Sequence, residues 1–318
     1  MIEYCICYSL DSKYTEQLCV SVSSILINSN ADEHFNFFIL YNELSDEDKQ
    51  NIEKLKNIKD FSIQYILMNY KDFENCPILS EKDENYKNYH VTLPTYFRFL
   101  IPDVLKTVNK VLYLDCDIIV KNSLTDLFNL DIKNNAAAMV LDSESEQEAK
   151  RLQLNKYFNA GVMLINLDYW RKNNIACKLF EYAKNNHDKI LWQDQDIINA
   201  VLNKEILEIP NIWNYQYFQY EEINEKIISD IKILHLAGRF KPWLMPFESE
   251  IYDEYYKYLD LTPYKNNILE YRLKASGKRL KNNIGGKTTN IVLNTTKEDV
   301  NEQFNSFNNS TDQKISNV

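Results

Sequence analysis

The sequence predicts an α/β fold built on a mainly parallel sheet with helices flanking it. Strand-like apolar runs alternate with helical patterns through the first 70 residues, and the alternation continues to about residue 202. Because parallel strands need crossover connections, usually helices, this alternation is typical of a parallel sheet. The chain has 318 residues, of which 45% are hydrophobic, enough for one large core or two modest ones.

The first five predicted elements form a β-α-β-α-β succession. Residues 3–10 are strand-like, and residues 14–27 carry apolar side chains at helical spacing. The aromatic run at 36–41 and the run at 61–67 are strand-like as well. Between them Ser45 precedes three acidic residues, which predicts a helix with a serine N-cap.

The middle of the chain continues this pattern after a polar stretch at 69–88. We expect a helix from residue 93, with Pro94 in its first turn, a strand through 111–120, a short capped helix at 123–128, strands at 136–141 and 158–167, and helices at 168–185 and 193–202. The charged segment 142–156 between two of these strands is a candidate lid.

The composition changes after Pro263. Asparagine becomes frequent and apolar residues become rare, so we expect one folded domain at 1–262 and a basic, asparagine-rich, partly disordered extension at 263–318. A helix at 265–281 would carry leucines on one side and basic residues around them. It is compatible with contact to an anionic membrane surface or a partner, and equally with a solvated helix.

Charge and composition exclude several classes of protein. The net charge of −10 argues against nucleic acid as the main partner. No run approaches the ~20 apolar residues of a membrane-spanning helix, and residues 1–4 do not begin a signal peptide, so we expect a cytoplasmic protein. The six cysteines lie mostly in apolar runs and are expected to be free thiols. The sequence leaves the oligomeric state open.

Glycine is scarce, and this limits how phosphate can be bound. The chain has five glycines, and the first is Gly161. A dinucleotide fingerprint or a P-loop needs glycines just after an early strand, where the backbone turns and approaches the phosphate. If a nucleotide binds, its phosphates must therefore be held by a metal and by side chains.

Two aspartates form a candidate cation site. The segment VLYLDCDIIV places Asp115 and Asp117 two residues apart between apolar runs. Residues i and i+2 of an extended segment point to the same side, so both carboxylates can face one ion, and such oxygen ligands suit Mn²⁺ or Mg²⁺. Taken alone, the pair fits turn or cap residues at the mouth of a buried strand equally well.

The segment HLAGRFKPW can complete this site. His235 ends a predicted strand and would favour manganese, which accepts imidazole more readily than magnesium does. Gly238 lets the backbone pass close to a ligand, and Lys241 offers a point charge to a phosphate. A lone histidine is more often a satisfied core residue, but the order of these residues favours the metal role.

Three other segments offer polar groups to a ligand. Asn159 has both a donor and an acceptor for a sugar hydroxyl. Residues 192–199 are rich in carboxylates and amides at a predicted helix start, which also fits a simple capped N-terminus. Arg98 could neutralise a diphosphate or fix a carboxylate.

Together and in this order, these segments resemble the family 8 retaining glycosyltransferases, the group of glycogenin and of bacterial lipooligosaccharide galactosyltransferases. The resemblance covers about residues 2–245, and its most specific parts are VLYLDCDIIV, YFNAGVMLINLDYWR, WQDQDIIN and HLAGRFKPW. It implies a GT-A type, Rossmann-like fold in a single catalytic domain. It also implies a hexosyltransferase that uses UDP-galactose or UDP-glucose with Mn²⁺, Mg²⁺ being the other candidate ion.

The resemblance implies roles for individual residues. The metal ligands would be Asp115, Asp117 and His235, and the catalytic candidates at the anomeric carbon would be Gln195 and Asp194. The implied substrate-binding residues are Ser9, Asp11 and Tyr14 for uridine, Gly238 and Lys241 for the diphosphate, Arg98 and Asn159 for the donor sugar, and Asp142 near the acceptor.

The predicted reaction moves a hexose, with retention at the anomeric carbon, to a hydroxyl of a glycan, glycolipid or glycoprotein, as in cell-surface polysaccharide biosynthesis. Bond breaking leaves negative charge on the diphosphate, which a divalent cation and Lys241 would stabilise.

One alternative is an inactive sugar-binding module on the same scaffold. The other, a sugar nucleotidyltransferase, would want an early glycine-rich loop. The basic extension could hold the cytoplasmic enzyme on the inner face of the plasma membrane.

Overall fold

The fold is described from a computed structural model of the chain. The structure describes residues 2–77, 92–217, 229–238, 241–244, 246, 249–275, 281–284 and 287–290. Contacts within the chain divide it into two compact units, Met1–Ala237 and Gly238–Val318. The predicted domain boundary between residues 262 and 263 stays a prediction.

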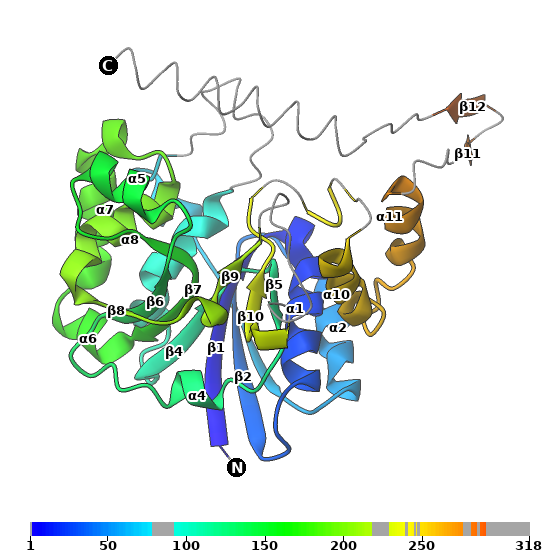
Figure 1. Cartoon of the computed structure of the whole chain (residues 1–318), viewed down its shortest axis with the longest axis horizontal. Coiled ribbons are helices and arrows are strands. Elements are labelled where there is room, and N and C mark those ends of the chain that lie inside the picture. The colour runs from blue at the N-terminus through cyan, green and yellow to red at the C-terminus, as the bar shows by residue number, and fades with distance from the viewer. Residues whose placement is uncertain are drawn as a thin grey trace. The chain divides into compact units, whose positions relative to one another are not determined.

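A seven-stranded sheet of order β3-β2-β1-β4-β7-β6-β8 forms the centre of the first unit (Figure 1). Its strands are β1 (Ile2–Leu10), β2 (Glu33–Tyr41), β3 (Ser62–Leu67), β4 (Lys110–Leu114), β6 (Ala137–Leu141), β7 (Phe158–Asn166) and β8 (Ile206–Glu208). Strands β1 to β4 run parallel, β7 is antiparallel to both neighbours, and β8 is parallel to β6. The predicted α/β fold with a mainly parallel sheet is confirmed.

Helices flank this sheet. They are α1 (Thr15–Ile27), α2 (Asp46–Glu53), α3 (Ile101–Val104), α4 (Thr125–Phe128), α5 (Ser145–Leu152), α6 (Leu167–Lys172), α7 (Ile175–Asn185) and α8 (Gln193–Leu202). In Figure 1 the blue helices α1 and α2 and the green helices α7 and α8 lie at opposite sides of the view, with the sheet between them. Ser45 caps α2 as predicted, in a reciprocal capping box with Asp48.

Two predicted helices differ from the observed ones. The helix expected from residue 93 is a 3-10 helix, η6 (Leu93–Leu100), followed by α3, and each has a proline in its first turn. The helix expected at 168–185 is divided into α6 and α7. Asn174 lies between them in the left-handed region with φ of 52°, a conformation that asparagine tolerates better than most residues.

The candidate lid at 142–156 contains α5 and is bound to the body of the unit. The Arg151 guanidinium donates to Asp196 at 2.6 Å and to the carbonyl of Lys189 at 2.8 Å. The Tyr157 hydroxyl donates to the same Asp196 carboxylate at 2.6 Å, and this carboxylate has no exposed surface. These contacts argue against a segment that moves freely over the site.

The topology places the predicted site at one edge of the sheet. Because β1 and β4 are parallel neighbours, the end of β1 at Leu10 and the end of β4 at Leu114 lie at the same edge. Ligands of open α/β sheets bind outside the carboxyl ends of the strands. Asp115 directly follows β4 and therefore lies at this edge.

A second, three-stranded sheet of order β5-β10-β9 brings the histidine to the aspartates. Its strands are β5 (Ile118–Val120), β9 (Tyr215–Gln216) and β10 (Ile233–His235). β10 runs antiparallel to β5 with His235 opposite Ile118, so the imidazole lies beside the residue that precedes β5, Asp117.

The second unit contains α10 (Glu250–Leu259), α11 (Asn267–Ala275) and a hairpin of β11 (Lys281–Ile284) and β12 (Lys287–Asn290). The prediction of one helix over 265–281 is wrong at its end, because 281–284 form a strand; Asn282 and Asn283 are poor helix formers. Leu280 lies outside the described residues. In α11, Arg272 pairs with Asp253 at 2.8 Å.

Among the residues that the structure describes, no helix is long and apolar enough to cross a membrane. Membrane contact through the basic extension and a cytoplasmic location stay predictions.

Candidate active site

The three predicted metal ligands lie together at the carboxyl edge of the sheet. The ligand atoms of Asp115, Asp117 and His235 are all within 4.8 Å of one another. The Asp115 N–H donates to the carbonyl of Gly161 at 2.9 Å, and the Asp117 carbonyl accepts from the N–H of Leu236 at 3.0 Å. The loop between β4 and β5 is thus held by β7 on one side and by the end of β10 on the other.

The chemistry of this cluster suits a divalent cation. His235 Nε2 lies 3.4 Å from Asp117 Oδ1, and the imidazole is buried whereas the Asp115 side chain is 30% exposed. Two carboxylates and one imidazole, open to solvent at one side, form a ligand set that Mn²⁺ accepts, with Mg²⁺ favouring the oxygens alone. The residues present therefore fit the metal that the sequence predicts.

Gly161 leaves the space that the imidazole occupies. A Cβ atom at this position would lie 2.4 Å from Cε1 and 2.8 Å from Nδ1 of His235. Such distances are far inside van der Waals contact, so a side chain at 161 would displace the ring. The contact with His235 thus explains why residue 161 is a glycine, and the sequence alone does not predict this contact.

Arg98 links the metal cluster to the start of α8. This buried guanidinium pairs with Asp115 Oδ1 at 2.9 Å and with Asp194 Oδ2 at 3.1 Å, and it donates to the carbonyl of Ala160 at 2.8 Å. Its carbon lies 4.1 Å from the ring centroid of Tyr113, whose hydroxyl also donates to Asp115. Burial alone would lower the pKa of Arg98, but the nearby carboxylates, chiefly Asp194, raise it, so the guanidinium stays charged.

Asp194 is a buried carboxylate at the first turn of α8. Burial raises its pKa from the ordinary 3.8 to about 6, although the Arg98 charge and a hydrogen bond from the Thr95 hydroxyl oppose this shift. The preceding residue, Gln193, has a φ of 38°, an uncommon value for a non-glycine residue.

The raised pKa of Asp194 predicts a pH dependence of folding stability. The folded pKa of about 6 exceeds the unfolded value of 3.8, so this group's contribution to stability is fully present below about pH 4 and is lost as the pH rises through about 6. The full change is about 3 kcal/mol, from about 1.4 kcal/mol per unit. We expect urea denaturation of metal-free protein to show wild type losing this stability relative to Asp194→Asn between pH 4 and 7. A difference between the two proteins that stays constant with pH would contradict the assignment.

A second polar cluster joins the predicted acceptor and donor-sugar residues. Asp142 Oδ2 accepts from Asn159 Nδ2 at 3.0 Å and from Gln195 Nε2 at 3.1 Å. Gln195 Oε1 in turn accepts from the N–H of Ala160 at 3.0 Å. Both ends of the Gln195 amide are therefore engaged, and its side chain has a fixed orientation.

The predicted uridine residues lie at the end of β1, near the metal cluster. Asp11 caps a short 3-10 helix, η1 (Ser12–Tyr14), and its carboxylate accepts from the Lys13 N–H at 3.0 Å. Burial raises the pKa of Tyr14, and the charge of Asp117 adds to this shift, which reports their proximity. The Cys116 thiol donates to the carbonyl of Ser9 at 3.9 Å.

Gly238 and Lys241 belong to the second unit. Gly238 has a φ of 75°, a value that favours glycine, so its predicted backbone freedom is used. Lys241 is buried, and its ammonium lies 5.9 Å from the ring centroid of Trp243. The predicted contact of both residues with a diphosphate stays a prediction.

Asn214 is a site residue that sequence reasoning missed. Its side chain is 1% exposed and contacts both Asn159, at 2.8 Å, and His235, at 3.0 Å. It ends a single 3-10 turn, η9 (Asn211–Trp213), in a segment without apolar periodicity or acidic clustering. Only the pairing of β9 with β10 brings it to the imidazole, and no local pattern signals that pairing.

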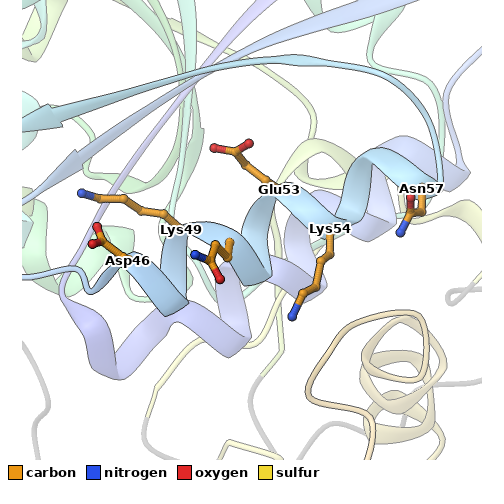
Figure 2. A pocket seen from close by; sticks show the side chains of 6 residues that line it. Asp46, Lys49, Glu53, Lys54 and Asn57 are labelled. Atoms are coloured by element: carbon orange, nitrogen blue, oxygen red, sulfur yellow. The ribbon is translucent and has the colours of Figure 1, made fainter.

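A shallow depression along α2 contains none of the predicted site residues. Figure 2 shows its labelled side chains, all from that helix and the turn after it, and its lining is Asp46, Lys49, Gln50, Glu53, Lys54 and Asn57. Charged groups of both signs at helical spacing are typical of a solvated helix face.

The chain is similar to known proteins over most of its length. Residues 5–245 match the model of the family described as glycosyl transferase family 8. A lipopolysaccharide 1,3-galactosyltransferase of Salmonella typhimurium is 30% identical over 75% of this chain and 72% of its own length. A lipopolysaccharide 1,2-glucosyltransferase of Escherichia coli K12 is 27% identical over 82% and 79%.

A solved structure shares the fold. The galactosyltransferase LgtC, crystallised in complex with donor and acceptor sugar analogs, superposes with a TM-score of 0.70 at 24% identity, over 81% of this chain and 96% of LgtC. This likeness supports the predicted GT-A type of fold.

Proposed function

The chain belongs to glycosyl transferase family 8 and is a hexosyltransferase, and from this premise we propose that it transfers galactose or glucose from a UDP-sugar to a carbohydrate hydroxyl, with Mn²⁺ as cofactor. The observation that carries the proposal is the cluster of Asp115, Asp117 and His235 at the carboxyl edge of the sheet. The named activities of the relatives support a hexose donor, and the sugar analogs bound by LgtC support a donor and a carbohydrate acceptor.

In this proposal Asp115, Asp117 and His235 hold the cation, which supplies electrostatic stabilisation of the charge that develops on the departing diphosphate. Hydrogen bonds within the protein orient Asp115 without substrate. Arg98 and Tyr113 both donate to Asp115 Oδ1, so the carboxylate is already oriented and its second oxygen is available to a ligand. Lys241 is proposed to add a positive charge against the diphosphate.

The surroundings of Gln195 and Asp194 support positioning roles in the retaining reaction. Gln195 is held by Ala160 and Asp142, and Asp194 is buried between Arg98 and the Thr95 hydroxyl. A carboxylate paired with a guanidinium is a weak nucleophile, and an amide is a poor one. We therefore favour attack of the acceptor from the leaving-group face over a covalent intermediate. Asp142 would then orient the acceptor hydroxyl, with Asn159 beside the donor sugar.

The test is release of UDP from a panel of UDP-sugars. We expect purified protein with Mn²⁺ and a mixture of carbohydrate acceptors to release UDP from UDP-galactose or UDP-glucose. We expect no release from UDP-sugars that carry any other sugar. NMR of the product would then give the linkage and the anomeric configuration. An absence of UDP release with every donor, with acceptors present, would contradict the proposed activity.

A further inference from the structure

A chain of hydrogen bonds between side-chain amides runs from the acceptor side of the site to the metal cluster. It passes from Asp142 to Asn159, from Asn159 to Asn214, and from Asn214 to His235, with lengths of 3.0, 2.8 and 3.0 Å. Asn159, Asn214 and His235 are at most 8% exposed. In such a buried chain each donor must meet an acceptor, since an unsatisfied polar group is costly there.

One backbone donor fixes the direction of the first bonds in this chain, and the other directions follow from it. The Gly161 N–H can only donate, and it lies 3.0 Å from Asn159, so the atom that it meets must be the carbonyl oxygen Oδ1. The Asn159 amide nitrogen then faces Asp142, whose carboxylate accepts. The orientation of Asn159 is thus set by the backbone of β7.

The same reasoning extends to Asn214 and then to His235. The Asn214 atom that approaches Asn159 Oδ1 at 2.8 Å must be a donor, and it is therefore Nδ2. Its other terminal atom, Oδ1, can only accept, and it lies 3.0 Å from His235 Nδ1. The imidazole proton must therefore be on Nδ1. In the neutral ring, Nε2 then carries a lone pair, and it is this nitrogen that lies 3.4 Å from Asp117 Oδ1.

We propose that Asn214 is a positioning residue that holds His235 in the tautomer protonated at Nδ1, so that the Nε2 lone pair faces the carboxylates. This inference rests on the metal role proposed above for His235. The partner at the second ring nitrogen commonly sets the tautomer and orientation of a metal-bound histidine. Here a neutral amide does so, and it also joins the imidazole to Asn159 and Asp142.

Nitrogen NMR of the metal-free wild-type protein tests the tautomer directly. Protein labelled with ¹⁵N-histidine and freed of metal by EDTA is recorded over a range of pH, and the tautomer is read from spectra in which one of the two ring nitrogens of His235 carries a proton and the other does not. The spectrum of His235→Asn assigns the resonances of His235 by their absence. We expect Nδ1 to carry the proton in wild type. A proton on Nε2 would overturn the proposal.

Two substitutions of Asn214 distinguish the effect of its acceptor oxygen from the effect of the rest of the side chain. Asn214→Leu removes the acceptor, so we expect mixed tautomers and an affinity for Mn²⁺ alone that is about 10-fold to 100-fold weaker, measured from the electron paramagnetic resonance of free Mn²⁺. Asn214→Asp keeps an oxygen facing Nδ1, and we expect it to keep the tautomer and to lose less affinity than Asn214→Leu. Wild-type tautomer and affinity in Asn214→Leu would contradict the inference. Should this variant not fold, the wild-type and Asn214→Asp spectra decide.

Asn199→Leu is the matched control. Asn199 is equally buried and also holds β7, through bonds of 2.7 and 2.8 Å to the backbone of Phe158. We expect its loss to lower stability while the His235 tautomer stays unchanged. If it altered the tautomer as Asn214→Leu does, the effect would reflect general loosening, and the specific role of Asn214 would be refuted. Absence of Mn²⁺ binding to wild type would contradict the metal site itself, whereas the tautomer is read without metal.

Discussion

Asp117→Asn is expected to lower the rate of UDP release on the order of 10³-fold, because it removes a charged ligand of the proposed cation site at the point where diphosphate charge develops. The Asp117 side chain is 13% exposed and lies beside His235, so its replacement removes a negative charge next to the imidazole. The amide keeps the size of the side chain but not its charge. The rate of UDP release and the Mn²⁺-dependent affinity for UDP are the quantities to measure.

The effect on stability distinguishes loss of a ligand from loss of the fold. Asp115 and Asp117 are like charges close together, so removing one should not lower the free energy of unfolding of the metal-free protein. Asp131→Asn is a suitable control, because this carboxylate is 71% exposed and its ion pair with the Lys133 ammonium is long, at 4.0 Å. The amide oxygen of asparagine can still accept the hydrogen bond from the Lys133 N–H, at 3.1 Å. Activity of Asp117→Asn equal to that of the control would refute the metal role.

Arg98→Met is expected to lower the free energy of unfolding by about 3–5 kcal/mol, the range for removing one partner of a buried ion pair. Without the guanidinium, the 8%-exposed Asp194 side chain must either keep a buried charge with no counter-ion or take up a proton as its pKa rises further, and both lower the stability of the folded state. The carbonyl of Ala160 also loses its side-chain donor. Urea denaturation near neutral pH measures the change, and UDP release should fall as well because Asp115 loses one of the two donors that orient its carboxylate.

Two further variants show whether the buried charge is responsible. Arg98→Met combined with Asp194→Asn should recover part of the lost stability, since the unpaired charge is then gone. Arg272→Met removes an arginine from a pair in which both side chains are 56% exposed, and exposed pairs contribute about 0–1 kcal/mol. Equal destabilisation by Arg98→Met and Arg272→Met, or no recovery in the double variant, would contradict this explanation.

The sequence predicts the fold well where local patterns determine it. The strand that ends at Leu10, the capped helix after Ser45 and the helix from Gln193 to Leu202 are all observed, since periodicity and capping act over a few residues. The break at Asn174 was missed because a single left-handed residue leaves the apolar periodicity on both sides intact. The low hydrophobicity of the C-terminal extension predicts disorder, so the hairpin of β11 and β12 does not follow from the sequence pattern.

The candidate site divides in the same way. Asp115, Asp117 and His235 could be selected from residue type and order, and the structure brings them together. The single extended strand expected through 111–120 is wrong, because residues 115–117 form a turn between β4 and β5, and this turn, not strand alternation, places the two carboxylates. Among the supporting residues Arg98 could be selected as a group that fixes a carboxylate, but its partners could not, and the roles of Gly161 and Asn214 could not be predicted, because these contacts are long-range. Arg98 meets its two carboxylates at separations of 17 and 96 residues, Gly161 makes room for a ring that lies 74 residues later, and Asn214 is aligned only by strand pairing.

The affinity for UDP with and without Mn²⁺ is the most direct test of the central claim that Asp115, Asp117 and His235 hold a cation that binds the diphosphate. Calorimetry of wild-type protein, first with Mn²⁺ and then with EDTA, should show UDP binding at least about tenfold weaker without the metal, a difference of about 1.4 kcal/mol. In Asp117→Asn this difference should shrink or vanish. Equal affinity for UDP in Mn²⁺ and in EDTA would contradict the claim.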